Sequence, residues 1–133
     1  MTIGGLSRYA PYLQSVLRIV AAFLFIAHGT QKLFAFPVNE PGSGFALMSL
    51  MGAAGILETV GGVLMFAGLF TRPVAFVLAG EMAVAYFLRH APGGPWPILN
   101  GGELAVLYCF IWLFFCAAGP GPWSLDAALR RRA

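Results

Sequence analysis

Residues 19–34 read IVAAFLFIAHGTQKLF, an unbroken apolar run followed by a segment that carries His28 and Lys32. On a helix these two side chains are four residues apart and therefore share one face. A charge at the centre of a bilayer costs at least about 2.5–3.5 kcal/mol, so such residues usually face a bundle interior or a watery cavity. The stretch therefore predicts a membrane helix with a polar pocket beside its second half.

The composition of the whole chain indicates an integral membrane protein. Of its 133 residues 59% are hydrophobic and only 10% are charged, and the mean hydropathy is +0.81. In a soluble domain, about a quarter of all residues would be charged. Lipid forces backbone polar groups into helices or closed barrels, and the long apolar runs lack the alternation of barrel strands. We therefore expect one all-α domain over residues 1–133, an integral membrane four-helix bundle.

Segments rich in proline and glycine separate the expected helices. We expect these helices at about 13–36, 45–70, 73–90 and 101–118. The segments 37–44 and 91–99 contain five prolines, which regular helix interiors do not accept. Asn100 is the expected N-cap of the fourth helix, with Glu103 completing a capping-box-like pair, and Ser124 is expected to cap a short helix in the C-terminal tail.

The basic residues predict the orientation in the membrane. If both termini face the cytoplasm, that side carries many more basic residues than the other side, which favours N-in and C-in. The two sets are Arg8, Arg18, Arg72, Arg130, Arg131 and Arg132 inside, and Lys32 and Arg89 outside. The C-terminal arginine run indicates a topology signal or a contact with anionic lipid, and we expect no nucleic-acid partner.

Cys109 and Cys116 are seven residues apart in one apolar run. On a helix this spacing corresponds to about 10.5 Å, which is too far for a disulfide. We expect both to be packing residues, because free cysteine is among the most buried residue types. The sequence predicts no metal site.

Ionisable residues from all four expected helices reach similar depth in this topology. The predicted ligand-binding set is His28, Lys32, Glu58, Glu81, Arg89, His90 and Glu103, and the first four are the candidate catalytic residues. The alternative is a structural ion-pair network that only fixes the register of the helices. A cap explains Glu103, and Arg89 and His90 suit a helix end at the interface. Glu58 and Glu81 are hardest to explain structurally, because each is isolated in an apolar helix.

The sequence resembles the DoxX family in an ordered set of pieces between about residues 13 and 126. These pieces are Leu17-Arg18, residues 25–34 (FIAHGTQKLF), 55–62 (GILETVGG), 68–72 (GLFTR), 81–87 (EMAVAYF) with His90, 100–103 (NGGE) and 119–126 (GPGPWSLD). The resemblance implies a small, multi-pass protein of the bacterial inner (plasma) membrane. In the wider DoxX/DoxD group it also implies redox work, as a subunit of a thiosulfate:quinone oxidoreductase or as the membrane anchor of a thiol and superoxide detoxification complex.

Three functional hypotheses follow. The first is a quinone-interacting or redox-partner subunit, since the chain shows no haem-ligating histidine pair, nucleotide motif or C-x-x-C pair. In it, His28 or a carboxylate relays a proton, Lys32 stabilises the reduced anion, and an aromatic slot holds the ring. The slot residues are Phe23, Phe25, Phe66, Phe110 and Phe114. The second is a non-catalytic scaffold or anchor for a soluble oxidoreductase complex. The third is a small-solute carrier, which homo-oligomerisation through the glycine-rich second helix would favour.

Overall fold

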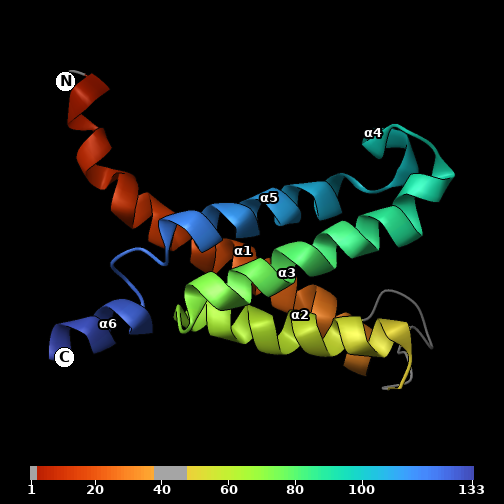
Figure 1. Cartoon of the computed structure of the whole chain (residues 1–133), viewed down its shortest axis with the longest axis horizontal. Coiled ribbons are helices and arrows are strands. Elements are labelled where there is room, and N and C mark those ends of the chain that lie inside the picture. Colours follow the sequence, from red (N-terminus) through yellow and green to blue (C-terminus); the bar gives the residue numbers. More distant parts are fainter. Residues whose placement is uncertain (1–2, 38–47) are drawn as a thin grey trace.

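The computed structural model describes residues 3–37 and 48–133, and within them it is helical and contains no strand (Figure 1). The α-helices are α1 (Ala10–Phe34), α2 (Leu50–Ala67), α3 (Thr71–Ala85), α4 (Pro97–Asn100), α5 (Glu103–Ala118) and α6 (Leu125–Arg132). A π-helical turn, η3 (Tyr86–His90), and a 3-10 turn, η4 (Ala91–Gly93), extend α3. Two further 3-10 turns, η1 (Ile3–Gly5) and η2 (Ser7–Tyr9), precede α1.

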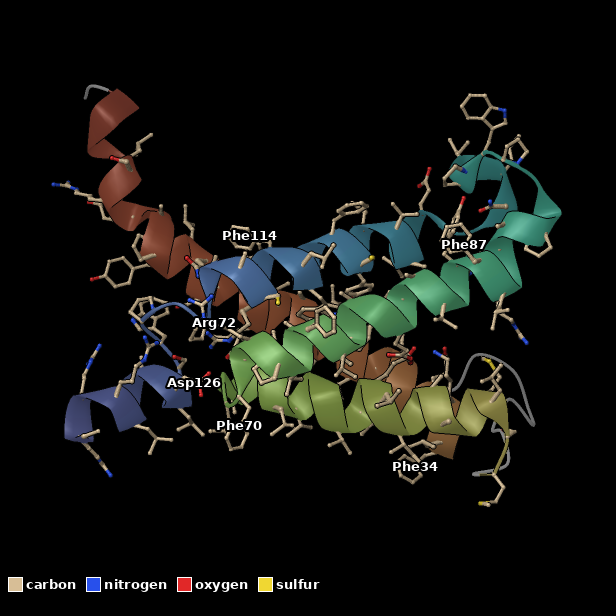
Figure 2. All side chains as sticks on the ribbon, in the orientation of Figure 1. Phe34, Phe70, Arg72, Phe87, Phe114 and Asp126 are labelled. Atoms are coloured by element: carbon tan, nitrogen blue, oxygen red, sulfur yellow. The ribbon has the colours of Figure 1, made fainter. Side chains whose placement is uncertain are left out.

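Three helical segments of the described chain are long and apolar enough to cross a membrane: Ser7–Phe34, Leu50–Ala67 and Thr71–Gly93. The apolar helix α5 has 16 residues. At 1.5 Å per residue it covers about 24 Å, somewhat less than the hydrocarbon core of about 30 Å. Large apolar side chains point outward from all of these helices, as Figure 2 shows for Phe34, Phe87 and Phe114. An apolar exterior of this kind suits contact with lipid.

The helices pack as two close pairs, α1 along α2 and α3 along α5, while α2 and α3 contact each other less extensively. Both chain ends lie at the same end of this arrangement (Figure 1). Between the pairs lies an aromatic and aliphatic core that includes Phe25, Met65, Leu78, Trp112 and Phe115. Trp112 and Phe115 are fully buried, so α5 contributes the largest side chains to the core.

Glycines bring α1 and α2 into close contact. A Cβ atom at Gly29 would lie 2.4 Å from Thr59 Oγ1, and one at Gly62 would lie 2.6 Å from Ile26. At Gly55 it would lie 2.9 Å from Leu33. The glycine-rich face of α2, from which we predicted homo-oligomerisation, is therefore occupied by α1 of the same chain.

The observed helix boundaries agree with the expected ones to within a few residues, apart from the start of the second helix. That helix was expected to begin at 45, which lies outside the described residues, and α2 begins at Leu50. The side chain of Ser49 caps it by accepting a hydrogen bond from Gly52 N at 3.0 Å. The predicted cap at Ser124 is confirmed, because Ser124 Oγ accepts from Ala127 N at 3.1 Å.

The predicted N-cap at Asn100 is wrong. Gly102 holds that position, and no side chain caps α5. The Asn100 side chain instead closes the preceding loop, since its Oδ1 accepts from Gly102 N at 2.8 Å and its Nδ2 donates to Gly94 O at 2.9 Å. The segment 91–99 is also more regular than expected, because Pro97 stands at the start of the one-turn helix α4, where proline loses no hydrogen bond.

Candidate functional site

A cavity of about 340 Å³ lies among α1, α2, α3 and α5. Five of the seven predicted ligand-binding residues line it together, namely His28, Lys32, Glu58, Arg89 and His90. The remaining walls are mostly apolar and include Phe25, Met51, Ala54, Met82, Ala85 and Tyr108. The cavity therefore combines one charged wall with an apolar remainder, which is the usual composition of a small-molecule site.

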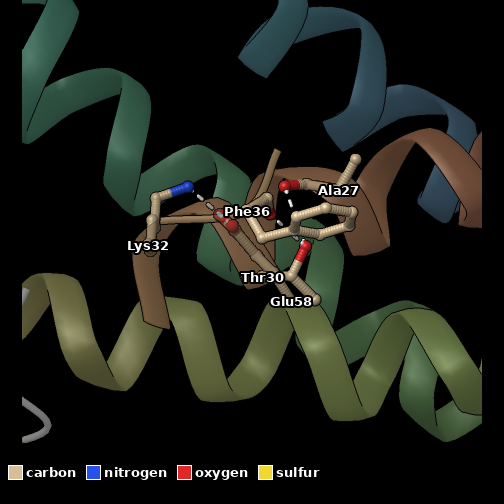
Figure 3. A network of polar contacts seen from close by, with 5 residues as sticks. All are labelled: Ala27, Thr30, Lys32, Phe36 and Glu58. Atoms are coloured by element: carbon tan, nitrogen blue, oxygen red, sulfur yellow. Dashed lines mark hydrogen bonds and ion pairs between the residues drawn. The ribbon is translucent and has the colours of Figure 1, made fainter. Parts of the chain in front are cut away.

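An ion pair between α1 and α2 forms the charged wall. Lys32 Nζ lies 2.6 Å from Glu58 Oε2, and the two side chains are 19% and 4% exposed (Figure 3). The close approach of the two helices at Gly29 and Gly55 makes this contact reachable, because a Cβ at Gly55 would lie only 3.1 Å from Lys32 Cβ. Lys32 neutralises the carboxylate that burial would otherwise penalise.

The end of α1 next to Lys32 is fixed by its own backbone. Thr30 Oγ1 donates to Phe36 O at 2.8 Å and approaches Ala27 O at 3.3 Å (Figure 3). Ala35 ends the helix in the left-handed conformation with a φ of 53°. These contacts hold the last turn of α1, so that Lys32 stays directed at Glu58.

Glu81 lies beside this pair but is not neutralised by it. Both of its carboxylate oxygens are buried and receive no hydrogen bond from the described part of the chain. Its neighbours are the Glu58 carboxyl, which lies close enough for the two carboxyl groups to interact directly, and the ammonium group of Lys32. Two carboxyl groups thus share one ammonium group. Buried polar atoms are nearly always paired, so an unpaired carboxyl at a cavity indicates a place for a ligand or a proton.

Glu81 lies in the wall of a second hollow. It lines a groove of about 280 Å³ between α2 and α3. This groove and the cavity have four wall residues in common, Met51, Ala54, Ala85 and Arg89. The candidate site therefore consists of an inner cavity with the ion pair and an outer groove with the second carboxyl.

At the loop end of the cavity, the π-helical turn η3 positions Arg89 and His90. His90 Nδ1 lies 3.2 Å from Asn100 O, which ties the ring to the α3–α5 connection. Glu103 is exposed at the start of α5 and is not among the lining residues, so the structure does not bring it to the other six. Within the described ranges, no three histidine, cysteine or acidic residues are grouped so as to hold a metal ion.

The aromatic slot expected from the sequence is wrong for four of its five residues. Phe23, Phe66, Phe110 and Phe114 are 63%, 45%, 65% and 47% exposed and point outward. Phe25 alone of the five lines the cavity.

Tyr108 is a cavity residue that the sequence reasoning missed. Its ring lies 4.9 Å from the Phe25 ring and 6.2 Å from the His28 ring, nearly perpendicular to the latter. Nothing in the apolar run of α5 distinguishes Tyr108 from the other aromatic residues there. Only the packing of α5 against α1 reveals its place beside His28.

A second buried charge, Arg18, lies toward the other end of α1. It is fully buried and donates to Met65 O at 2.8 Å, to Trp123 O at 2.6 Å and to Pro120 O. The sequence reasoning treated Arg18 only as a topology signal. Its three acceptors are backbone carbonyls, and every residue has one, so the sequence does not indicate which residues accept from Arg18.

Next to Arg18, Asp126 accepts hydrogen bonds from Phe70 N and Thr71 N, each at 2.9 Å (Figure 2). The backbone N–H of Asp126 donates to Gly68 O, also at 2.9 Å. The segment after α5 is thereby held against α1 and against the α2–α3 turn.

Comparisons with known proteins find relatives that match most of the chain. The chain is 44% identical over 128 residues to an uncharacterized protein of Haemophilus influenzae, and the match covers 93% of this chain and 96% of that protein. It is 30% identical over 135 residues to an uncharacterized membrane protein of Mycobacterium tuberculosis, covering 88% of this chain and 81% of that protein. No solved structure matches. The family model for DoxX matches residues 13–91, which span α1, α2, α3 and η3. With its three apolar helices of spanning length, this chain is a membrane protein and belongs to the DoxX family.

Proposed function

We propose that this protein binds the head group of a quinone in the cavity between α1, α2, α3 and α5 and serves as the membrane subunit of a redox partner protein. The observation that carries the proposal is the Lys32–Glu58 ion pair at the cavity, with the unpaired carboxyl of Glu81 beside it. Ligand pockets typically begin at about 300 Å³. A cavity of about 340 Å³ therefore suits a single substituted ring and little more.

Each lining group has a role in this proposal. The Lys32 ammonium and a ring N–H of His28 donate hydrogen bonds to the carbonyl oxygens of the head group, and Glu58 keeps Lys32 in place. Glu81 has no competing donor and can hold a proton at the edge of the cavity. The bound quinone would supply the electron-accepting chemistry, and a soluble redox protein would supply the electrons.

The setting of the site is part of the proposal: a multi-pass four-helix bundle in the bacterial inner membrane, with both termini in the cytoplasm. The position of both chain ends at one end of the helices supports an even number of crossings (Figure 1). The close packing of α3 along α5 supports α5 as the fourth crossing despite its length. The basic residues Arg8, Arg72 and Arg130 at the end with the termini support its cytoplasmic location.

A scaffold that anchors a soluble oxidoreductase is the second candidate, and α6 favours it. Asp126 fixes the start of α6 to the α2–α3 turn, and Arg130, Arg131 and Arg132 are exposed at its end. A basic helix held in a defined position is a suitable docking surface for an acidic partner.

Organic extraction and mass spectrometry of the protein purified in mild detergent test the proposal. We expect near-stoichiometric quinone in the wild type, its loss in Glu58→Gln, and its retention in Glu103→Gln. The last variant is the matched control, because Glu103 is an exposed carboxyl outside the cavity lining. Absence of quinone from folded wild-type protein, or equal amounts in Glu58→Gln, would overturn the quinone proposal and leave the scaffold in front.

A further inference from the structure

The seam between α2 and α3 is a loosely packed contact between two of the long apolar helices. The two helices join at the short turn around Leu69 and then diverge (Figure 1). They contact each other less than α1 contacts α2 or α3 contacts α5. Side chains do not fill the outer side of this seam, and two hollows lie along it.

The two hollows form one apolar track. The first is about 320 Å³, lies nearer the turn, and includes Leu64 and Pro73 in its wall. The second is the groove of about 280 Å³ that contains Glu81. Leu57 and Val77 line both, so the two hollows adjoin each other. Measured along α2 from Leu50 to Leu64, the track is about 21 Å long.

The groove that contains Glu81 adjoins the polar cavity. Met51 and Ala54 from α2, and Ala85 and Arg89 from α3, are the walls that groove and cavity share. The two alanines are the smallest of these shared wall residues, so little side-chain volume separates groove and cavity at this point. Met51 and Arg89 flank them, and both are long, flexible side chains that can move without changing the backbone.

We propose that the α2–α3 seam holds the isoprenoid tail of the quinone, and that the head group enters the cavity sideways from the bilayer between Ala54 and Ala85. This inference rests on the proposed function, because it assigns the tail of the same ligand. The continuity of the walls selects this occupant. A ligand that fills both spaces needs a polar end for Lys32 and His28 and a long apolar remainder for the track.

Glu81 stands where tail and head would meet. Its oxygens are buried and unpaired, yet the groove that it lines is otherwise almost wholly apolar. A head group that passes between the helices would come within reach of this carboxyl before it reaches Lys32. This placement explains why a carboxyl lies in the wall of an apolar track.

Two quinones and two tryptophan variants test the inference in detergent-solubilised protein. The ligands are a tailless benzoquinone and the same ring carrying a decyl chain. Val77→Trp fills the track where its two parts join. Val63→Trp is the control: Val63 lies on α2 outside both linings and is 52% exposed, close to the 51% of Val77. We expect the decyl compound to bind the wild type about tenfold more tightly than the tailless ring, and Val77→Trp alone to remove this advantage without changing binding of the tailless ring.

A photoreactive group at the end of the decyl chain gives a second measurement that does not depend on a variant. We expect the covalent adducts on the part of the track around Val60 and Val74. Adducts scattered over the apolar exterior would overturn the inference. Equal effects of Val77→Trp and Val63→Trp would also overturn it. So would a decyl chain that gives no gain in affinity, while the tailless ring still binds the wild type and fails to bind Glu58→Gln. In these cases the proposed function survives. If neither quinone binds folded wild-type protein, both proposals are wrong.

Discussion

Two cationic side chains, the buried Arg18 and the partly buried Lys32, lie on the same helix and have opposite surroundings. They are 14 residues apart on α1, which corresponds to about 21 Å. Arg18 is fully enclosed, and its guanidinium donates to three backbone carbonyls from two other parts of the chain. Lys32 is paired with one carboxylate at the wall of a cavity, and a second carboxyl nearby has no partner.

The difference separates a structural charge from a candidate functional one. Buried polar atoms that are all paired specify one arrangement of the backbone and are costly to alter. Buried polar atoms that stay unpaired at a cavity cost folding free energy, which a ligand or a proton can offset. By this criterion the Arg18 site stabilises the fold, and the Lys32, Glu58 and Glu81 site is the place for chemistry.

Arg18→Met should cause the largest loss of stability in the protein. It leaves the carbonyls of Pro120 and Trp123 without their donor, and Met65 O with Gly68 N as its remaining donor. At about 1–3 kcal/mol for each of the two unsatisfied groups and about 1 kcal/mol for the bond lost at Met65 O, we expect a loss of about 3 kcal/mol or more in the free energy of unfolding. Thermal unfolding in detergent, followed by circular dichroism, measures it.

The matched control is Arg131→Met, which removes an exposed arginine of α6. We expect a change within about 0.5 kcal/mol for this variant. Arg18→Lys should fall between the two, because an ammonium group cannot reproduce the fork of guanidinium donors. If Arg18→Met were as stable as Arg131→Met, the assignment of Arg18 as a structural charge would be wrong.

Lys32→Met should have the second-largest effect. It leaves Glu58, which is 4% exposed, without its cation and close to the Glu81 carboxyl. Because Lys32 itself is partly exposed, we expect a loss of about 2 kcal/mol, below the range for a fully buried pair. Adding Glu58→Gln should recover most of this loss while ligand binding stays absent. A double variant no more stable than Lys32→Met would show that the pair is not the source of the effect.

The sequence could predict the features that depend on residue type alone. The apolar runs specified the helices, and three of the ionisable residues inside them, His28, Lys32 and Glu58, lie in the wall of the cavity. Their position on the chain sufficed, because a lone charge in an apolar helix must face the interior.

The part that could not be predicted depends on backbone groups and on tertiary packing. Arg18 resembled an ordinary flanking arginine, since its acceptors lie 47, 102 and 105 residues away and are carbonyls. Asn100 and Glu103 have the spacing of a capping box, yet the glycine at 102 takes the cap and the asparagine folds back onto the loop. Tyr108 could be assigned to the cavity only after α5 was placed against α1.

Glu81→Leu should not lower the free energy of unfolding, in contrast to Arg18→Met and Lys32→Met. A leucine suits the apolar groove and removes a buried carboxyl that has no donor among the described residues. Replacing such a group by an apolar one of similar size is expected to be neutral or to stabilise the fold by about 1 kcal/mol. Quinone co-purification should nevertheless fall, and thermal unfolding and extraction on the same preparation measure both. A loss of stability as large as that of Lys32→Met would place Glu81 in the structural network instead.

Asp126→Asn should have the smallest effect, and its pH dependence is its signature. Burial raises the pKa of the Asp126 carboxyl, but hydrogen bonds from the N–H groups of Thr71 and Phe70 and the nearby charge of Arg130 lower it, and the net result is a pKa below the ordinary value. Such a carboxylate stabilises the fold above its unfolded pKa of about 3.9, and this contribution is lost as the pH falls through the folded pKa. Asparagine retains one of the two acceptor oxygens, so we expect a loss of about 1 kcal/mol at neutral pH.

The stability difference between wild type and Asp126→Asn should therefore be constant from neutral pH down to about pH 5 and shrink below about pH 4. Unfolding curves for both proteins at each pH measure it, and changes at other carboxyl groups cancel in the difference. Glu103→Gln, an exposed carboxyl at the opposite end of α5, should show no such pH-dependent difference. A difference for Asp126→Asn that does not change with pH would mean that the amide loses shape or packing and not the charge-assisted hydrogen bonds to Phe70 and Thr71. The hydrogen bonds that Asp126 accepts at the start of α6 would then contribute less to stability, compared with the contacts of Arg18, than their geometry indicates.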